Sequence, residues 1–269
     1  MTNQRVRPTS AAGLFYPDNP AELTKMVDGL LSDVPTTPNS AVPPAILVPH
    51  AGYIYSGSTA AHSFALWRDA PIEHVVIVGP THRVGVGAAA LPEADAMATP
   101  LGDVPIWADG VARITELPQV LSSAEVHEDE HSLEVQLPFL QRVLPGGFDV
   151  LPLAAGWVTP EAVAQVIQSL WGTPGMGVVI SSDLSHYHRY DEAKAIDGAT
   201  LAQVLTLDAT INHNQACGAT GLNAMLLLAA DHHLTPRLLA SCNSGDTAGD
   251  RHRVVGYAAV AFEESHGVS

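Results

Sequence analysis

The fold of this chain follows from two short segments, AILVPH at residues 45–50 and HVVIVGPTH at residues 74–82. Both contain consecutive β-branched and aliphatic residues without polar alternation, a pattern typical of strands buried on both faces of a sheet. A helix is predicted between them, near residues 58–68. This βαβ arrangement predicts two parallel strands joined by a right-handed crossover.

The rest of the sequence extends the same architecture. A strand at 148–154, a helix at 160–170 and a strand at 178–182 predict a second βαβ unit, and residues 86–107 predict a hairpin excursion. No repeat or linker divides the sequence, so we expect one α/β domain over residues 1–269 with a mainly parallel or mixed central sheet flanked by helices. Further helices and late strands are predicted at 20–31, 108–117, 132–144, 191–206, 215–231, 237–242 and 254–263.

Composition limits the partners of the protein. Hydrophobic residues make up 46% of the 269 residues, and 28 acidic against 12 basic residues give a net charge of −16. This charge argues against nucleic acid or an anionic membrane surface as a partner. The sequence shows no secretory signal and no apolar stretch of transmembrane length. We therefore expect a cytoplasmic protein in which Cys217 and Cys242 stay reduced.

Two histidines follow the first two predicted strands directly. His50 comes after Pro49, and His82 comes after Pro80 and Thr81. Ligands of open α/β sheets bind just outside the carboxyl ends of parallel strands, so both imidazoles are expected at one edge. Two imidazoles with one carboxylate are typical of non-haem Fe(II) sites, and imidazole also suits zinc and copper. The pair therefore predicts a metal or catalytic site.

The third strand end adds a carboxylate and another imidazole. Asp183 follows the strand, and His186 lies three residues further on. Asp183 can orient an imidazole, ligate a metal or cap the following helix. His186 is our candidate acid–base group because imidazole titrates near neutral pH. His188 is expected to face solvent.

The segment HEDEH at residues 127–131 matches the zinc-protease pattern H-E-x-x-H and its inverse. That chemistry needs a helix with both histidines on one face, whereas the preceding residues resemble a loop and the apolar periodicity starts near Leu133. We expect instead that His131 and Glu130 reach the cleft from a helix N-terminus.

The third metal ligand is open at this point. Asp246 or Cys242, at a polar glycine-containing turn, can supply it, unless that segment is an ordinary loop. Cys217 is expected as a small buried residue at a helix start. Tyr53 is expected at the cleft, and Arg83, beside His82, is the nearest cation for an anionic ligand.

Eight short segments are distributed along nearly the whole chain. They are AGLFYP at 12–17, VPHAGYIYSG at 48–57, GPTH at 79–82, TPLG at 99–102, EHSLEVQLPF at 130–139, SSDLSH at 181–186, ACG at 216–218 and NSGDT at 243–247. In this order they resemble the Memo proteins, called AmmeMemoRadiSam system protein B in prokaryotes. The Memo fold is similar to that of class III extradiol dioxygenases, which cleave catechol rings with non-haem Fe(II).

The resemblance implies a metal cleft that uses His50 and His82, with Asp183 and His186 beside it. The dioxygenases complete the metal site with a late glutamate, and animal Memo proteins carry a late cysteine in that region. This chain has no late glutamate in the motif. The prokaryotic family name implies a pathway association with radical-SAM and AMMECR-type proteins.

Two hypotheses follow for the function. The first is redox or oxygenase-like chemistry at a divalent metal, Fe(II) before copper or zinc, on a small molecule. The second is a binding module that captures a peptide or small anion in a cleft without chemistry. Metal-assisted hydrolysis is a third, weaker hypothesis.

Overall fold

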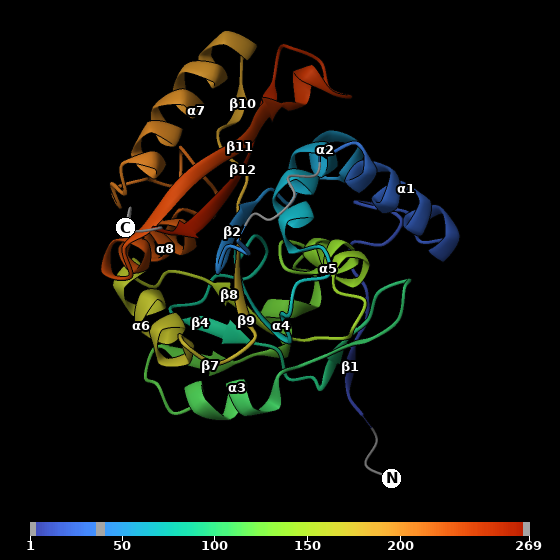
Figure 1. The fold of residues 1–269 in the computed structure, drawn as a ribbon, viewed down its shortest axis with the longest axis vertical. Helices are drawn as coiled ribbons and strands as arrows, with labels where there is room; N and C mark the ends of the chain where they lie inside the picture. Colours follow the sequence, from blue (N-terminus) through green and yellow to red (C-terminus); the bar gives the residue numbers. More distant parts are fainter. Residues whose placement is uncertain (1–3, 36–40, 266–269) are drawn as a thin grey trace.

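A large mixed sheet runs through the centre of the computed structural model, which describes residues 4–35 and 41–265 (Figure 1). The strand order is β10-β12-β2-β9-β3-β8-β4-β7, with β11 paired to β12. Its strands are β2 (Ala45–Val48), β3 (His74–Pro80), β4 (Ala89–Leu91), β7 (Val120–Ser122), β8 (Asp149–Ala155), β9 (Met176–Ser181), β10 (His186–His188), β11 (Leu234–Asn243) and β12 (Val254–Glu264).

The two predicted βαβ units interlock at the centre of this sheet. Strands β2, β9, β3 and β8 are parallel neighbours, so each unit contributes a strand that lies between the two strands of the other. Ile46 of β2 is paired in register with Val179 of β9, which in turn is paired with Ile77 of β3. All three strand ends that carry the predicted site residues therefore reach the same edge.

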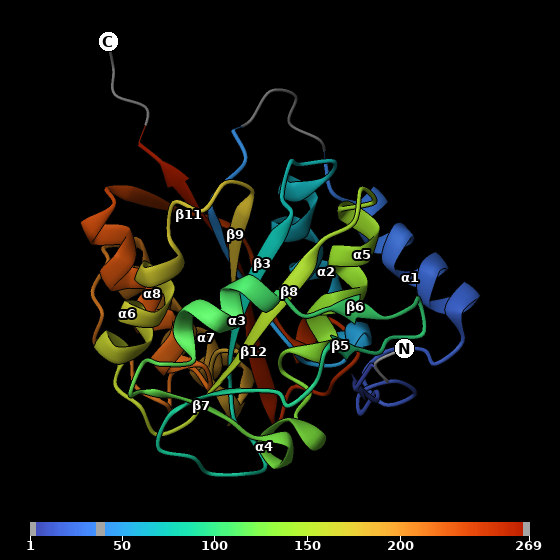
Figure 2. The same ribbon diagram turned by 90° about the horizontal axis from the view of Figure 1, so that it is seen from below.

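Helices cover both faces of the sheet, as Figure 2 shows. Side chains of β2 alternate between two cores: Ala45 and Leu47 pack with one set of helices, and Ile46 and Val48 with the other. The first set is α3 (Ala108–Ile114), α6 (Pro160–Leu170), α7 (Tyr190–Leu205) and α8 (Ala219–Asp231), and the second is α1 (Pro20–Ser32), α2 (Tyr53–Phe64) and α5 (Leu137–Val143). Burial on both faces explains why these strands lack polar alternation.

A second, small sheet anchors the N-terminal arm. Strand β1 (Val6–Arg7) pairs in parallel with β5 (Ala96–Met97), which pairs antiparallel with β6 (Val104–Pro105). Only part of the predicted hairpin excursion over 86–107 is a hairpin. β5 and β6 form it, whereas β4 joins the main sheet beside β8.

Several short elements and boundaries differ from the prediction. Helix α2 begins at Tyr53 rather than near residue 58 and is followed by a 3₁₀ turn, η1 (Ala65–Trp67). The short helix α4 (Ala124–Glu128) was not predicted; Ser123 caps it by accepting the N–H of Val126. Two further 3₁₀ turns are η2 (Glu134–Gln136) and η3 (Ser244–Asp246). Within the described residues, no helix combines the length and the hydropathy needed to cross a bilayer.

Candidate metal centre

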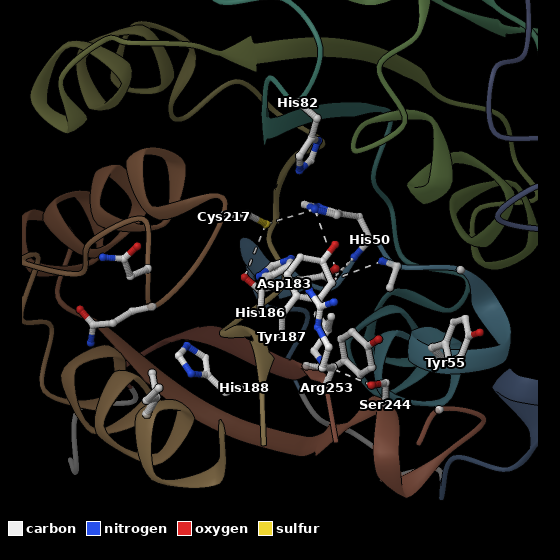
Figure 3. A pocket seen from close by; sticks show the side chains of 18 of the residues that line it. His50, Tyr55, His82, Asp183, His186, Tyr187, His188, Cys217, Ser244 and Arg253 are labelled. Atoms are coloured by element: carbon white, nitrogen blue, oxygen red, sulfur yellow. Dashed lines mark hydrogen bonds and ion pairs between the residues drawn. The ribbon is translucent and has the colours of Figure 1, made fainter. Parts of the chain in front are cut away.

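Three imidazoles meet at the carboxyl edge of the parallel strands. Figure 3 labels two of them, His50 and His82. His50 follows β2, His82 follows β3, and His131 comes from the segment between α4 and η2. One nitrogen from each ring lies within 4.8 Å of the other two. The ring centroids of His82 and His131 are 4.6 Å apart, and that of His50 is 5.1 Å from His82. His50 and His82 were expected together as ligands and His131 as a residue of the same cleft; the structure brings the ring of His131 into the group with the other two.

Hydrogen bonds fix which nitrogen of His50 carries the proton. Its Nδ1 lies 2.9 Å from the hydroxyl of Ser181. That hydroxyl donates its one hydrogen to the carbonyl of Ser132 at 2.6 Å and accepts from the Gln136 amide at 2.9 Å. The hydroxyl is left as an acceptor for His50, so Nδ1 carries the hydrogen and Nε2 keeps its lone pair. The lone pair is what a metal requires.

His82 is oriented by a buried carboxylate. Glu130 accepts from Nδ1 of His82 at 2.9 Å and from the backbone N–H groups of His82 and Ser132 at 2.6 and 2.8 Å. Burial acts to raise the pKa of Glu130, but these hydrogen bonds outweigh it and lower the pKa to about 2. An ionised carboxylate behind an imidazole is a common support for a metal-binding histidine.

Two imidazoles of this group, those of His50 and His131, are held neutral by their surroundings. Burial and the neighbouring His82 lower the pKa of His50 to about 3. Burial and the neighbouring His50 lower the pKa of His131 to about 4. The ring of Phe15, on the N-terminal arm, stacks on His131 with centroids 4.2 Å apart and shields it. Neutral imidazole is the form that binds metal ions.

Asp183 and His186 lie beside the three histidines. One oxygen of Asp183 accepts the backbone N–H of His50 at 2.8 Å, and the other lies 4.0 Å from His50 Nε2. Burial raises the pKa of Asp183. The Nδ1–H of His186 donates to the Leu184 carbonyl at 2.8 Å, which leaves its Nε2 free to accept a proton.

Cys217 is a site residue that the sequence did not single out. Its sulfur lies 3.2 Å from Nε2 of His50, at the start of α8. Burial raises the pKa of this thiol to about 12. The adjacent Gly218 permits the approach, because a Cβ there would lie 2.7 Å from the carbonyl oxygen of Ser181. The only signal in the sequence was the glycine next to this cysteine. Its meaning depends on the neighbouring strand β9, which carries Ser181.

These groups line a cavity of about 1320 Å³. The exposed residues Tyr187 and Arg253, labelled in Figure 3, also line it and mark its mouth. Tyr187 adopts a left-handed backbone conformation with φ +63°, which costs about 1–3 kcal/mol for a residue with a side chain. It occupies a bulge where the pairing of β10 with β12 shifts register between His186 and His188. Bulges next to active sites commonly redirect a side chain.

Three imidazoles, two with an acceptor fixed on the opposite nitrogen, match the donor chemistry of a divalent metal site. The His50–His82–His131 group can therefore hold a divalent metal ion.

The family model for Memo-like protein matches residues 7–261. The chain belongs to the Memo family. A MEMO1 family protein of Metallosphaera sedula is 34% identical over 283 aligned residues, covering 96% of this chain and 99% of the relative. One from Aquifex aeolicus is 35% identical, covering 96% and 99%, and one from Methanopyrus kandleri is 33% identical, covering 95% and 98%.

Two predicted third ligands of the Memo site lie elsewhere. The sulfur of Cys242 contacts the hydroxyl of Thr59 at 3.1 Å, and the carboxylate of Asp246 accepts from Tyr190 at 2.5 Å. Neither lines the cavity, and the position beside His50 and His82 is taken by His131. Strand β11 turns the side chain of Cys242 toward α2, and η3 turns that of Asp246 toward α7.

Two other expected cleft residues of the Memo chain are also displaced. Tyr53 is buried in the core behind the site and donates to the Val135 carbonyl at 2.6 Å; Tyr55 lines the cavity instead. Arg83 is exposed and does not line the cavity. His127 is buried and its Nε2 bonds the Ala90 carbonyl at 2.9 Å, so HEDEH does not form a zinc-protease helix, as expected.

Proposed function

We propose that this Memo protein is a metal-dependent oxidoreductase that holds Fe(II) through His50, His82 and His131 and performs oxygenase-like chemistry on a small molecule. The observation that carries the proposal is the convergence of three imidazoles within 4.8 Å, two of which, those of His50 and His131, have a lowered pKa. The preference for iron and the oxygenase-like chemistry are supported by the resemblance to class III extradiol dioxygenases. Copper and zinc share the same ligand preference and are the competing metals.

The donor set explains what such a metal would offer. Three neutral ligands do not offset the positive charge of a divalent ion. They also leave coordination positions open to the cavity. Bound Fe(II) would supply a Lewis acid for a bidentate substrate and one-electron chemistry with O₂.

The protein's own residues would handle the protons. His186 is the proposed base: its Nδ1–H is committed to the Leu184 carbonyl, so Nε2 would take a proton from a substrate hydroxyl. Asp183 would act as a positioning residue, since it holds the backbone N–H of His50. Phe15, stacked on His131, would exclude water from that side of the cleft.

Metal reconstitution tests the proposal. Purified protein is loaded anaerobically with Fe(II), Cu(II) or Zn(II), desalted and analysed for bound metal by elemental mass spectrometry. We expect about one ion per chain in the wild type and a loss of bound metal in His50→Ala, His82→Ala and His131→Ala. His62→Ala, on α2 and outside the cavity lining, is the matched control. Equal metal content in all variants would contradict the proposal.

A binding module without chemistry is the alternative. The cavity of about 1320 Å³ favours this alternative because it is larger than a small ring needs and can hold a peptide segment. A ligand that binds the folded state raises the melting temperature by mass action. A melting temperature that rises with peptides and not with any metal would favour this alternative.

A further inference from the structure

The mouth of the cleft contains an arginine that forms no close ion pair with a carboxylate of the described residues. Arg253 precedes β12 and is the one Lys or Arg among the described residues that line the cavity. Within residues 4–35 and 41–265, no carboxylate lies within 4.0 Å of its guanidinium. Asp250, which also lines the cavity, accepts the backbone N–H of His252 at 2.7 Å instead of pairing with this side chain.

The side chain of Arg253 is held by a strained aromatic residue. Its guanidinium lies 4.9 Å from the ring centroid of Tyr187, a cation–π arrangement. Tyr187 is the bulged residue of β10, has a positive φ and is 63% exposed. A strained, exposed aromatic residue has no packing reason to be there, because burial does not stabilise it. Strained residues cluster at ligand-binding positions.

A second arginine on the same turn, Arg251, is paired within the protein and serves as a comparison. Arg251 stacks on Tyr190 at 4.3 Å and lies 4.0 Å from the carboxylate of Asp246, which Tyr190 also contacts. Arg251 does not line the cavity. The Arg251 guanidinium therefore has a carboxylate of the protein beside it, whereas among the described residues that of Arg253 has none within 4.0 Å and can bind a ligand.

We propose that Arg253, oriented by Tyr187, binds an oxyanion of the substrate at the mouth of the cleft. The cognate substrate is then an acidic small molecule whose other end reaches the three histidines. The planar guanidinium suits a carboxylate or phosphate, which it can bind through two parallel hydrogen bonds. On a chain of net charge −16, such a local cation favours the entry of an anion. The inference rests on the proposed function because it names the substrate class of the same cleft.

The oxyanion subsite is tested on metal-free protein, so that its outcome does not depend on the metal. Dissociation constants are measured by calorimetry for 3-phenylpropionate, 2-phenylethyl phosphate and the neutral 3-phenylpropionamide. We expect the better of the two anions to bind about tenfold more tightly than the amide, and the difference between the anions identifies the oxyanion. Arg253→Gln should abolish this preference, and Arg251→Gln should retain it. Equal affinities for acid and amide in the wild type, or a preference that survives Arg253→Gln, would overturn the inference.

The role of Tyr187 and the link to the metal are separated by two further arms. Tyr187→Phe keeps the ring and should keep the anion preference, whereas Tyr187→Gly should reduce it; an unchanged preference in Tyr187→Gly would remove Tyr187 from the inference. Binding of 3-(3,4-dihydroxyphenyl)propionate to iron-loaded wild type and His82→Ala tests the proposed function. A metal-independent affinity there, with the acid preference intact, would reject the metal role and leave the oxyanion subsite standing.

Discussion

The proton on His50 depends on one hydroxyl, that of Ser181. This hydroxyl already donates to Ser132, so it can serve His50 only as an acceptor. Without it, the imidazole is free to rotate or to place its hydrogen on Nε2. The metal-binding tautomer of His50 is thus set by a residue of β9, not by β2, the strand that precedes the histidine.

Ser181→Ala should weaken metal binding by about 10–100-fold without removing a ligand, which is the usual effect of losing such a supporting contact. The affinity is measured by competition with a chelator of known strength. Ser63→Ala is the matched control, because it removes another buried hydroxyl, one that bonds the Leu47 carbonyl of β2 and does not contact His50. An affinity equal to that of the wild type in Ser181→Ala would show that the hydroxyl does not set the imidazole.

Sequence predicted the part of the site that local pattern determines. His50 and His82 end apolar strands, so parallel pairing brings them together. Cys217 depends on the packing of α8 against β9, which no local pattern encodes. The expectation for Cys242 failed because β11 pairs with β12 in a register that turns its side chain toward Thr59.

At the scale of elements, α4 is fastened to β4 through a buried histidine. His127 contacts the Ala90 carbonyl through Nε2, and its own carbonyl accepts from Arg7. Burial lowers the pKa of His127 from 6.5 to about 4. The unfolded chain therefore takes up a proton near pH 6.5, whereas the folded chain does so only near pH 4. As pH falls through this window, His127 favours unfolding.

His127→Gln should make stability less dependent on pH between 6.5 and 4. The lost dependence approaches one proton, or about 3 kcal/mol over the window. The measurement is the free energy of unfolding in urea at several pH values, compared between this variant and the wild type. Parallel curves from pH 6.5 to 4 would mean that His127 is protonated alike in both states.

Helix and strand positions were more predictable than helix ends. The strands β2 and β3 and the helices α1 and α6 lie close to their predicted ranges because their apolar spacing is strong. Helix α2 starts five residues early, and α4 has one and a half turns supported by a serine cap, too short for periodicity to register.

At the scale of the whole molecule, a buried ion pair joins the N-terminal arm to the site. Glu134 of η2 is fully buried and accepts from Arg7, from the backbone of Ser10 and Ala11, and from the hydroxyl of Tyr16. Phe15, which covers His131, lies within the segment fixed by these contacts. The folding of the N-terminal arm and the shielding of His131 by Phe15 therefore depend on the same contacts.

Glu134→Gln should destabilise the protein by about 3–5 kcal/mol, because it leaves the charge of Arg7 buried without a partner. Arg142→Gln removes the exposed pair with Asp28 and should cost at most about 1 kcal/mol. Urea unfolding followed by circular dichroism measures both. Comparable losses in the two variants would contradict a structural role for the buried pair.

The interlocking of the two βαβ units sets the order in which the protein can mature. On the ribosome, His50 and His82 emerge long before β9, the strand that carries Ser181 and inserts between their strands. A nascent chain that has not reached residue 181 can carry all three histidines of the group but lacks the hydroxyl that fixes the tautomer of His50. We therefore expect a metal ion to bind tightly only after β9 has inserted between β2 and β3, rather than to template the folding of the first half of the chain.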